Sequence, residues 1–248
     1  MGKFAFEICA NSVESCIAAQ NGGADRVELC AGIPEGGTTP SYGEIKTARR
    51  ILTDTKLHVI IRPRGGDFLY TGLEIERMIE DIIIAKQLGA DGIVCGCLTK
   101  EGNIDTETCK KLIKYADGMS MTFHRAFDHC SNPYKALEEL IALGFNRVLT
   151  SGQQQTADKG TILLGELKRQ ANGRITILAG CGVNENNIRR IYKETGVTEF
   201  HFSARTAIKS RMEHINEKVY MGDKDTCERY VMETSAERVA ETIKACIG

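Results

Sequence analysis

The chain has 248 residues, of which 42% are hydrophobic, and its 32 Lys and Arg nearly balance its 33 Asp and Glu. This length allows one barrel-sized domain or two small ones, and the balanced charge argues against nucleic acid or an anionic membrane as a partner. The charged N-terminus does not fit a signal peptide, and no apolar run reaches the roughly 18 residues of a membrane span. Ten cysteines spread over so large a chain indicate free thiols. We therefore expect a cytoplasmic protein.

Eight strand-like apolar runs alternate with helix-like segments along the chain. They cover residues 3–9, 26–29, 57–62, 92–95, 120–124, 147–150, 175–178 and 199–203. Capping-box patterns at 41–44, 71–74 and 234–237 mark helix starts, and Asn184 precedes another helical run. Eight βα units of about 31 residues each predict an α/β protein, a (β/α)8 TIM barrel that occupies residues 1–248 as a single domain. The alternative, an open doubly wound sheet, lacks its expected G-x-G-x-x-G after the first strand.

Two connections are longer than the roughly 2–6 residues usual in α/β units. Residues 31–42 contain Gly36, Gly37 and Pro40, and residues 205–233 separate the last strand from the last helix. Both follow strands, so a barrel places them on its catalytic face, where long loops commonly form walls or lids. For the second connection, a tolerated insertion is the alternative.

The first two predicted strands end alike, in Glu7-Ile-Cys9 and Glu28-Leu-Cys30. Alternation puts each Glu and Cys on one side of its strand, and adjacent parallel strands lie about 4.8 Å apart, so the two thiols can be neighbours. Paired thiolates suit Cu(I), although both cysteines can instead be small core residues. Glu7 and Glu28 do not fit simple packing, because carboxylates are almost never buried without a partner. Either is a candidate catalytic base.

Positively charged side chains follow the third strand. Arg62 can face inward and pair with Glu7, Glu28 or a substrate anion, and Arg64 and Asp67 follow in the loop. We predict an anion-binding role for these loop residues. The alternative is a buried charge network that holds no ligand.

The fourth strand ends in a second thiol cluster, Cys95-Gly-Cys97, which is a weak metal motif by itself. If Gly92, Val94 and Gly96 face the barrel interior, both cysteines point toward the helices instead.

Histidines end the fifth and eighth strands. His124 shares one face of its strand with Thr122, Met121 and Phe123 take the other face, and His201 lies two residues before a serine. A histidine can act as acid, base or ligand near neutral pH, although a lone one is often only hydrogen-bonded. The strand ends deliver further polar candidates to the same rim: Arg125, Asp128, Ser151 and Ser203.

A glycine turn, Ala179-Gly-Cys-Gly-Val-Asn184, precedes a predicted helix. Backbone N–H groups at helix starts bind phosphate or other anions, and barrels often place such sites after strands seven and eight. Gly180, Gly182 and Asn184 are therefore candidate anion-binding residues. The alternative is a tight turn that needs positive φ and binds nothing.

Taken together, several of these segments resemble the CutC family of copper homeostasis proteins. The resemblance rests on Glu7-Ile-Cys9, Gly23-Ala-Asp-Arg-Val-Glu-Leu-Cys30, Gly36-Gly-Thr-Thr-Pro-Ser41, Ile61-Arg-Pro-Arg-Gly-Gly-Asp-Phe68, Thr122-Phe-His-Arg-Ala-Phe-Asp128, Leu149-Thr-Ser-Gly152 and Glu199-Phe-His201. It implies a TIM barrel, cytoplasmic residence, a homo-oligomer (dimer or tetramer) and a part in copper handling, with Cys9 and Cys30 as Cu(I) thiols. Cys181 departs from the family pattern, which more often has a third glycine there.

Two functions stay open from the sequence. The first is copper homeostasis through Cu(I) bound by Cys9 and Cys30. The second is a barrel enzyme for a small phosphorylated or carboxylated metabolite, with Glu7 or Glu28 as base and His124 as acid or orienting group.

Overall fold

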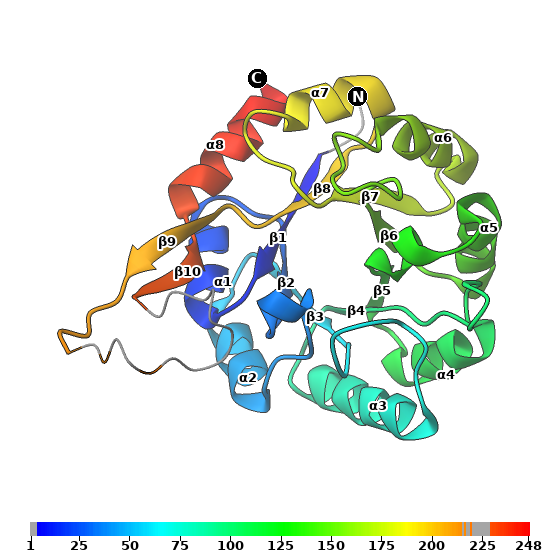
Figure 1. Ribbon diagram of the computed structural model, residues 1–248, viewed down its shortest axis with the longest axis horizontal. Coiled ribbons are helices and arrows are strands. Elements are labelled where there is room, and N and C mark those ends of the chain that lie inside the picture. The colour runs from blue at the N-terminus through cyan, green and yellow to red at the C-terminus, as the bar shows by residue number, and fades with distance from the viewer. Residues whose placement is uncertain (1–3, 215, 217–218, 220–228) are drawn as a thin grey trace.

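The structure is a computed structural model that describes residues 4–214, 216, 219 and 229–248. Eight parallel strands form a closed barrel in chain order, each paired with the next and the eighth with the first. Figure 1 looks down this barrel and shows the helices as a ring outside it. The strands are β1 (Ala5–Ala10), β2 (Arg26–Leu29), β3 (Lys56–Ile60), β4 (Gly92–Cys95), β5 (Ser120–Phe123), β6 (Arg147–Thr150), β7 (Thr176–Gly180) and β8 (Glu199–Phe202). The predicted TIM-barrel fold is confirmed.

The outer helices follow the strands as a (β/α)8 chain requires. They are α1 (Val13–Asn21), α2 (Tyr42–Ile51), α3 (Gly72–Gln87), α4 (Thr106–Ala116), α5 (Pro133–Leu143), α6 (Thr161–Ala171), α7 (Ile188–Thr195) and α8 (Ala236–Ile247). Two short 3-10 helices, η1 (Ile33–Glu35) and η2 (Arg125–His129), lie in loops after β2 and β5. Every helix in the described residues is too short or too polar to cross a bilayer.

Local capping explains where several helices begin. The capping boxes predicted for α2 and α3 are both present. The third prediction is wrong by one residue, because Ser235 rather than Thr234 caps α8. Thr234 ends a strand instead, and its backbone N–H donates to Ser15 Oγ. The helix predicted directly after Asn184 starts three residues later, because Asn187 is the residue that precedes α7.

Side chains alternate between the barrel interior and the helix layer. Cys95 and Cys97 belong to the apolar layer under the helices, as the inward parity of the glycines predicted. Gly92 and Gly96 face inward, where a Cβ would lie 2.5 Å from His58 Nε2 and 2.6 Å from His124 Nδ1. These glycines therefore make room for two histidine rings inside the barrel.

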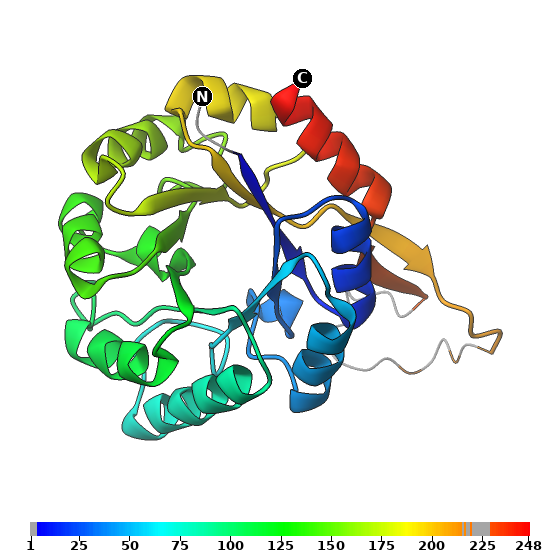
Figure 2. The ribbon, with the colours of Figure 1, turned by 180° about the vertical axis from the view of Figure 1, so that it is seen from behind.

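The two long connections behave differently. Residues 31–42 contain η1, and Gly36 lines the barrel mouth, so this loop is a wall as predicted. The connection after β8 starts with an antiparallel ribbon of β9 (Arg205–Lys209) and β10 (Tyr230–Thr234). In Figures 1 and 2 the ribbon projects sideways from the barrel instead of covering its opening. Positions 215, 217–218 and 220–228 of this connection lie outside the described residues.

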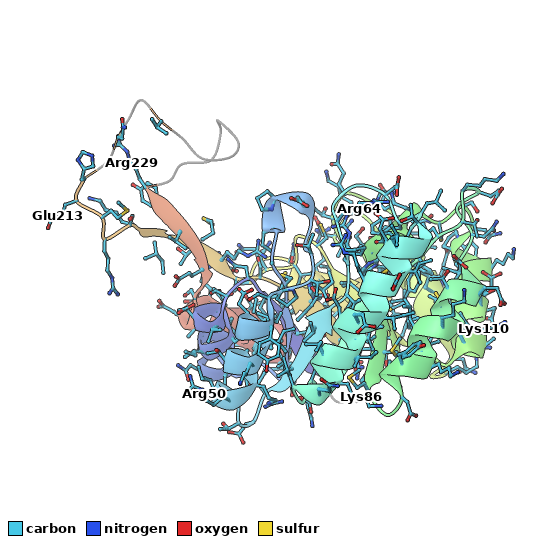
Figure 3. All side chains as sticks on the ribbon, turned by 90° about the horizontal axis from the view of Figure 1, so that it is seen from below. Arg50, Arg64, Lys86, Lys110, Glu213 and Arg229 are labelled. Carbon is cyan, nitrogen blue, oxygen red and sulfur yellow. The ribbon has the colours of Figure 1, made fainter. Side chains whose placement is uncertain are left out.

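The two ends of the barrel differ in what they carry. Figure 3 views the barrel from the side, with Arg64, which follows β3, at one end and Arg50 and Lys86 at the other. The end marked by Arg64 is where the strands finish, so loop residues from all eight strands meet there.

Candidate functional site at the carboxyl end of the barrel

Two thiols meet at this end of the barrel. Cys9 in β1 and Cys30, directly after β2, have their Sγ atoms 3.5 Å apart. One carboxylate oxygen of Glu28 joins them, and the three possible ligand atoms lie within 4.8 Å of one another. The predicted pairing of the thiols is therefore present. The other cysteines in the described residues are also free.

The environment of the thiols makes them unequal. The hydrogen bond with Cys30 lowers the pKa of Cys9 well below its usual value, and the charges of His201 and Arg205 add to this effect. Arg205 Nη2 donates to Cys9 Sγ at 3.2 Å. The same thiol pair raises the pKa of Cys30, which is also buried. The lowered pKa favours the thiolate form of Cys9, whose Sγ lies within hydrogen-bonding distance of the Cys30 thiol.

Beneath the thiols, Glu7 anchors a buried charge network. Its carboxylate contacts Arg26 on one side and accepts a hydrogen bond from His201 Nδ1, at 2.8 Å, on the other. Arg26 also pairs with Glu199 at 2.9 Å. Burial alone would raise the pKa of Glu7, but the charge of Arg26 and the His201 hydrogen bond hold that pKa well below its usual range. Glu7 is therefore an ionised group that orients its partners.

Glu28 has a different environment from Glu7, although each residue begins a Glu-x-Cys motif at the end of its strand. It is buried, and its Oε1 has no hydrogen-bond partner. Its Oε2 lies 3.7 Å from His201 Nε2. Burial raises the pKa of Glu28 to about 8. The charge of His201 opposes this increase, and the charge of Cys9 adds to it. Burial by itself would lower the pKa of His201, but Glu28, Cys9 and Glu7 raise it well above its usual value.

A cavity of about 270 Å³ opens above these groups. It is lined by residues from six strands or the loops that follow them, namely Cys9, Glu28, Gly36, Ile60, Arg62, Gly66, Phe68, His124, Arg125, His129, Leu149 and His201. Several of these residues were predicted from the sequence to share one site: Glu28, Arg62, His124, Arg125 and His201. Glu7 lies behind His201, outside the lining.

Other predicted site residues are engaged elsewhere. Arg64 pairs with Glu74 at 2.5 Å and with Asp67 at 3.0 Å, and neither Arg64 nor Asp67 lines the cavity. The carboxylate of Asp128 accepts hydrogen bonds from Arg125 and from the backbone and hydroxyl of Ser151. Asp128 and Ser151 therefore position Arg125 at the rim.

The glycine turn after β7 borders a second cavity of about 350 Å³, whose lining includes Gly182, Asn184 and Ser203. Asn184 fixes the turn itself, because its side-chain amide donates to Gly182 O and its backbone N–H donates to Asn187 Oδ1. Gly180 has a packing role, since a Cβ there would lie 2.5 Å from Leu149 Cδ1.

Cys181 in this turn adopts φ +76°, a left-handed conformation that disfavours side chains. Cys181→Gly is expected to raise the free energy of unfolding by about 0.5–1 kcal/mol, because relief of strain exceeds the loss of the Sγ hydrogen bond to Gln155 O. Urea unfolding measures the change. Cys181→Ala is the matched control: it keeps the Cβ and loses the hydrogen bond, so it should not stabilise. A gain for alanine equal to that for glycine would refute the strain argument.

Three residues that matter at this site were not predicted. Arg205 places a positive charge next to Cys9. The ring of Phe68 lies 5.2 Å from the Arg62 guanidinium carbon, and His58 lies 4.0 Å from Glu7 inside the barrel. Strand alternation gave a usable signal for His58, which has the same parity as Arg62. Arg205 and Phe68 follow strand ends, where loop geometry decides the direction of a side chain.

Comparison with known proteins places this arrangement in a family. A family model described as the CutC family matches residues 4–206. The chain belongs to the CutC family. A relative from Bacteroides thetaiotaomicron, named a family protein CutC, is 64% identical, and the match covers 99% of each chain.

Solved structures agree with this CutC assignment. A CutC protein from Streptococcus agalactiae, whose copper-homeostasis name is provisional, superimposes with a TM-score of 0.78 at 38% identity, covering 81% of this chain and 98% of its own. A thiamine phosphate pyrophosphorylase from Pyrococcus furiosus gives a TM-score of 0.61 at 17% identity, covering 99% of this chain and 98% of its own. That second likeness shows the barrel fold alone. The resemblance read from the strand-end motifs is confirmed.

Proposed function

We propose that this CutC-family chain takes part in copper homeostasis in the cytoplasm by binding Cu(I) through Cys9 and Cys30. The observation that carries the proposal is the 3.5 Å separation of the two Sγ atoms at the barrel mouth. Soft thiolates bind Cu(I) far better than they bind hard cations such as Mg²⁺ or Ca²⁺. The name of the solved CutC structure from Streptococcus agalactiae points to the same ion.

The surroundings of the thiols favour a monovalent soft ion. Arg205 Nη2 donates to Cys9 Sγ at 3.2 Å, which favours the thiolate form of Cys9 that a metal ligand requires. The nearby Glu28 oxygen is a hard donor and adds little to the affinity for Cu(I). Arg205 and His201 offset the negative charge of two thiolates.

Anaerobic titration with a chromogenic Cu(I) chelator tests this function. We expect the protein to withdraw one Cu(I) per chain from the chelator, with a matching loss of two thiols reactive toward a thiol reagent. A chain that withdraws no Cu(I), or one whose reactive thiols are unchanged by the ion, would contradict the proposal.

A second candidate function, catalysis on a small anionic metabolite, is favoured by groups that a copper site does not need. Arg62 and His124 line the same cavity, and the hydrogen bonds of their side chains join them to backbone groups. A comparison of turnover in the presence and absence of Cu(I), on any metabolite found to bind, separates the two functions.

We also propose that the chain forms a homo-oligomer. The ribbon of β9 and β10 carries exposed apolar side chains, including Ile208, Val231 and Met232, each 44–51% exposed. A two-stranded ribbon is only marginally stable alone in water, so a partner surface would support it. Light scattering after size-exclusion chromatography measures the number of chains.

A further inference from the structure

The cavity at the barrel mouth contains a buried cation without an anionic partner. Arg62 is 5% exposed, and its Nη1 donates to the carbonyls of Glu35 and Gly37, both at 2.8 Å. Its Nη2 donates to Gly66 O at 2.9 Å. These acceptors are uncharged, and no ion pair joins Arg62 to a carboxylate in the part of the chain that the structure describes. Since buried charges are normally paired, this wall of the cavity lacks an anion.

A fixed hydrogen-bond donor lies in the same wall. His124 Nδ1 accepts the backbone N–H of Ala126 at 3.2 Å, so the proton of the neutral ring is on Nε2. That Nε2 is buried and has no partner. Burial and the nearby charge of Arg62 lower the pKa of His124 to about 3, which keeps the ring neutral. Buried polar groups are rarely left unsatisfied, so this donor requires an acceptor.

Phe68 joins these two groups into one surface. Its ring centroid lies 5.2 Å from the Arg62 guanidinium carbon and 5.1 Å from the centre of the His124 ring. Cys9 and Glu28 line the same cavity. The wall formed by Arg62, His124 and Phe68 is thus the positive and donor-rich part of the cavity.

We infer that this cavity binds a small organic carboxylate, with the carboxylate group against Arg62 and His124 and the carbon skeleton against Phe68. This inference rests on the second candidate function, because it names the ligand class of the same cavity. The site supplies charge and two buried nitrogens without a partner, Arg62 Nε and His124 Nε2, which suits a monoanion with two oxygens. A volume of about 270 Å³ falls below the roughly 300–1,000 Å³ of drug-sized sites, so the ligand has few carbon atoms.

The same geometry disfavours a phosphate ester. Both N–H groups of Arg62 Nη1 are already used, and the glycine turn after β7 is fixed by its own side chains. The sequence left phosphorylated and carboxylated metabolites equally open, and the contacts of Arg62 favour the carboxylate.

Saturation-transfer NMR on the full chain tests the inference without requiring turnover. The probes are lactate, glycerate and glycolate, with lactamide and glycerol as comparison compounds. Inorganic phosphate, which has no carbon-bound protons, is compared by its ability to displace the bound carboxylate. We expect saturable binding of at least one carboxylate, and binding of the comparison compounds about tenfold weaker or worse. The measurement is made on the copper-free chain, so the presence or absence of Cu(I) binding does not decide this test.

Three variants locate the site. His124→Asn keeps an acceptor for the Ala126 N–H and removes the free donor, so it should weaken carboxylate binding about tenfold. Arg62→Met removes the charge and should weaken binding at least as much. Arg174→Met is the control, because Arg174 pairs with Glu138 on the outer surface, and it should bind like wild type. If Arg62→Met does not fold, His124→Asn decides alone.

Each outcome of these binding experiments either supports or overturns the inference. Binding that requires His124 and prefers a carboxylate supports the inference, whether or not any turnover is ever found. Absence of saturable binding by all three carboxylates, tighter binding of phosphate, or undiminished binding by His124→Asn overturns it.

Discussion

Cys9→Ser/Cys30→Ser is expected to lower the affinity for Cu(I) by about a thousandfold or more. The two sulfur atoms lie 3.5 Å apart, and the other nearby donor is a carboxylate oxygen of Glu28. Serine hydroxyls are hard donors that Cu(I) binds poorly, so the variant loses the soft ligands of the site. A thousandfold change corresponds to about 4 kcal/mol, which competition with a Cu(I) chelator measures reliably.

Cys181→Ser is the matched control for this experiment. Cys181 lines the adjoining cavity at the same end of the barrel, and its Sγ donates to Gln155 O instead of meeting another thiol. We expect this variant to bind Cu(I) like wild type. Equal affinity of wild type and the double serine variant would show that copper, if it binds, is held elsewhere.

Glu7→Gln is expected to lower the free energy of unfolding by about 3–5 kcal/mol, the range seen when one partner of a buried ion pair is removed. Glu7 is fully buried and is in contact with Arg26 and with His201, which is also buried. Glutamine has almost the same shape, but it leaves Arg26 with less compensating charge and offers His201 a weaker acceptor. Urea unfolding followed by circular dichroism measures the loss.

Glu138→Gln provides the comparison on the outer surface. Glu138 makes the same kind of pair, with Arg174 at 2.7 Å, but both side chains are about half exposed to water. Solvent-exposed pairs contribute little to stability, so this variant should unfold close to wild type. If both glutamine variants lost the same stability, burial of the Glu7 network would not be the cause of its effect.

Strand parity made the core of the site predictable. Glu7 and Cys9 were expected on one side of their strand with Cys9 next to Cys30, because residues two apart in a strand point to the same face and the first two strands are neighbours in the barrel. The same rule put Thr122 and His124 on one face and Met121 and Phe123 on the other, and in the structure Met121 and Phe123 belong to the apolar layer. Parity is a local property of the backbone, and a sequence displays it directly.

Loop residues were less predictable. Arg62 and Arg64 are two residues apart and looked equivalent, yet Arg62 lines the cavity while Arg64 turns outward to Glu74. Past the strand end no ladder fixes the direction of a side chain, so the surrounding carbonyls and carboxylates decide it. Arg205 was not predicted for the same reason, because its contact with Cys9 depends on where the ribbon of β9 and β10 starts.

The sequence by itself determined the eight βα units, the resemblance to the CutC family and the pairing of two thiols at the strand ends. Only the tertiary structure decided that Glu7 is an ionised anchor while Glu28 has a free oxygen, although both precede a cysteine by two residues. The physical reason is that the charge state of a buried group depends on which opposite charge reaches it. Glu7 meets Arg26 across the strand pair, and Glu28, one layer higher in the barrel, does not.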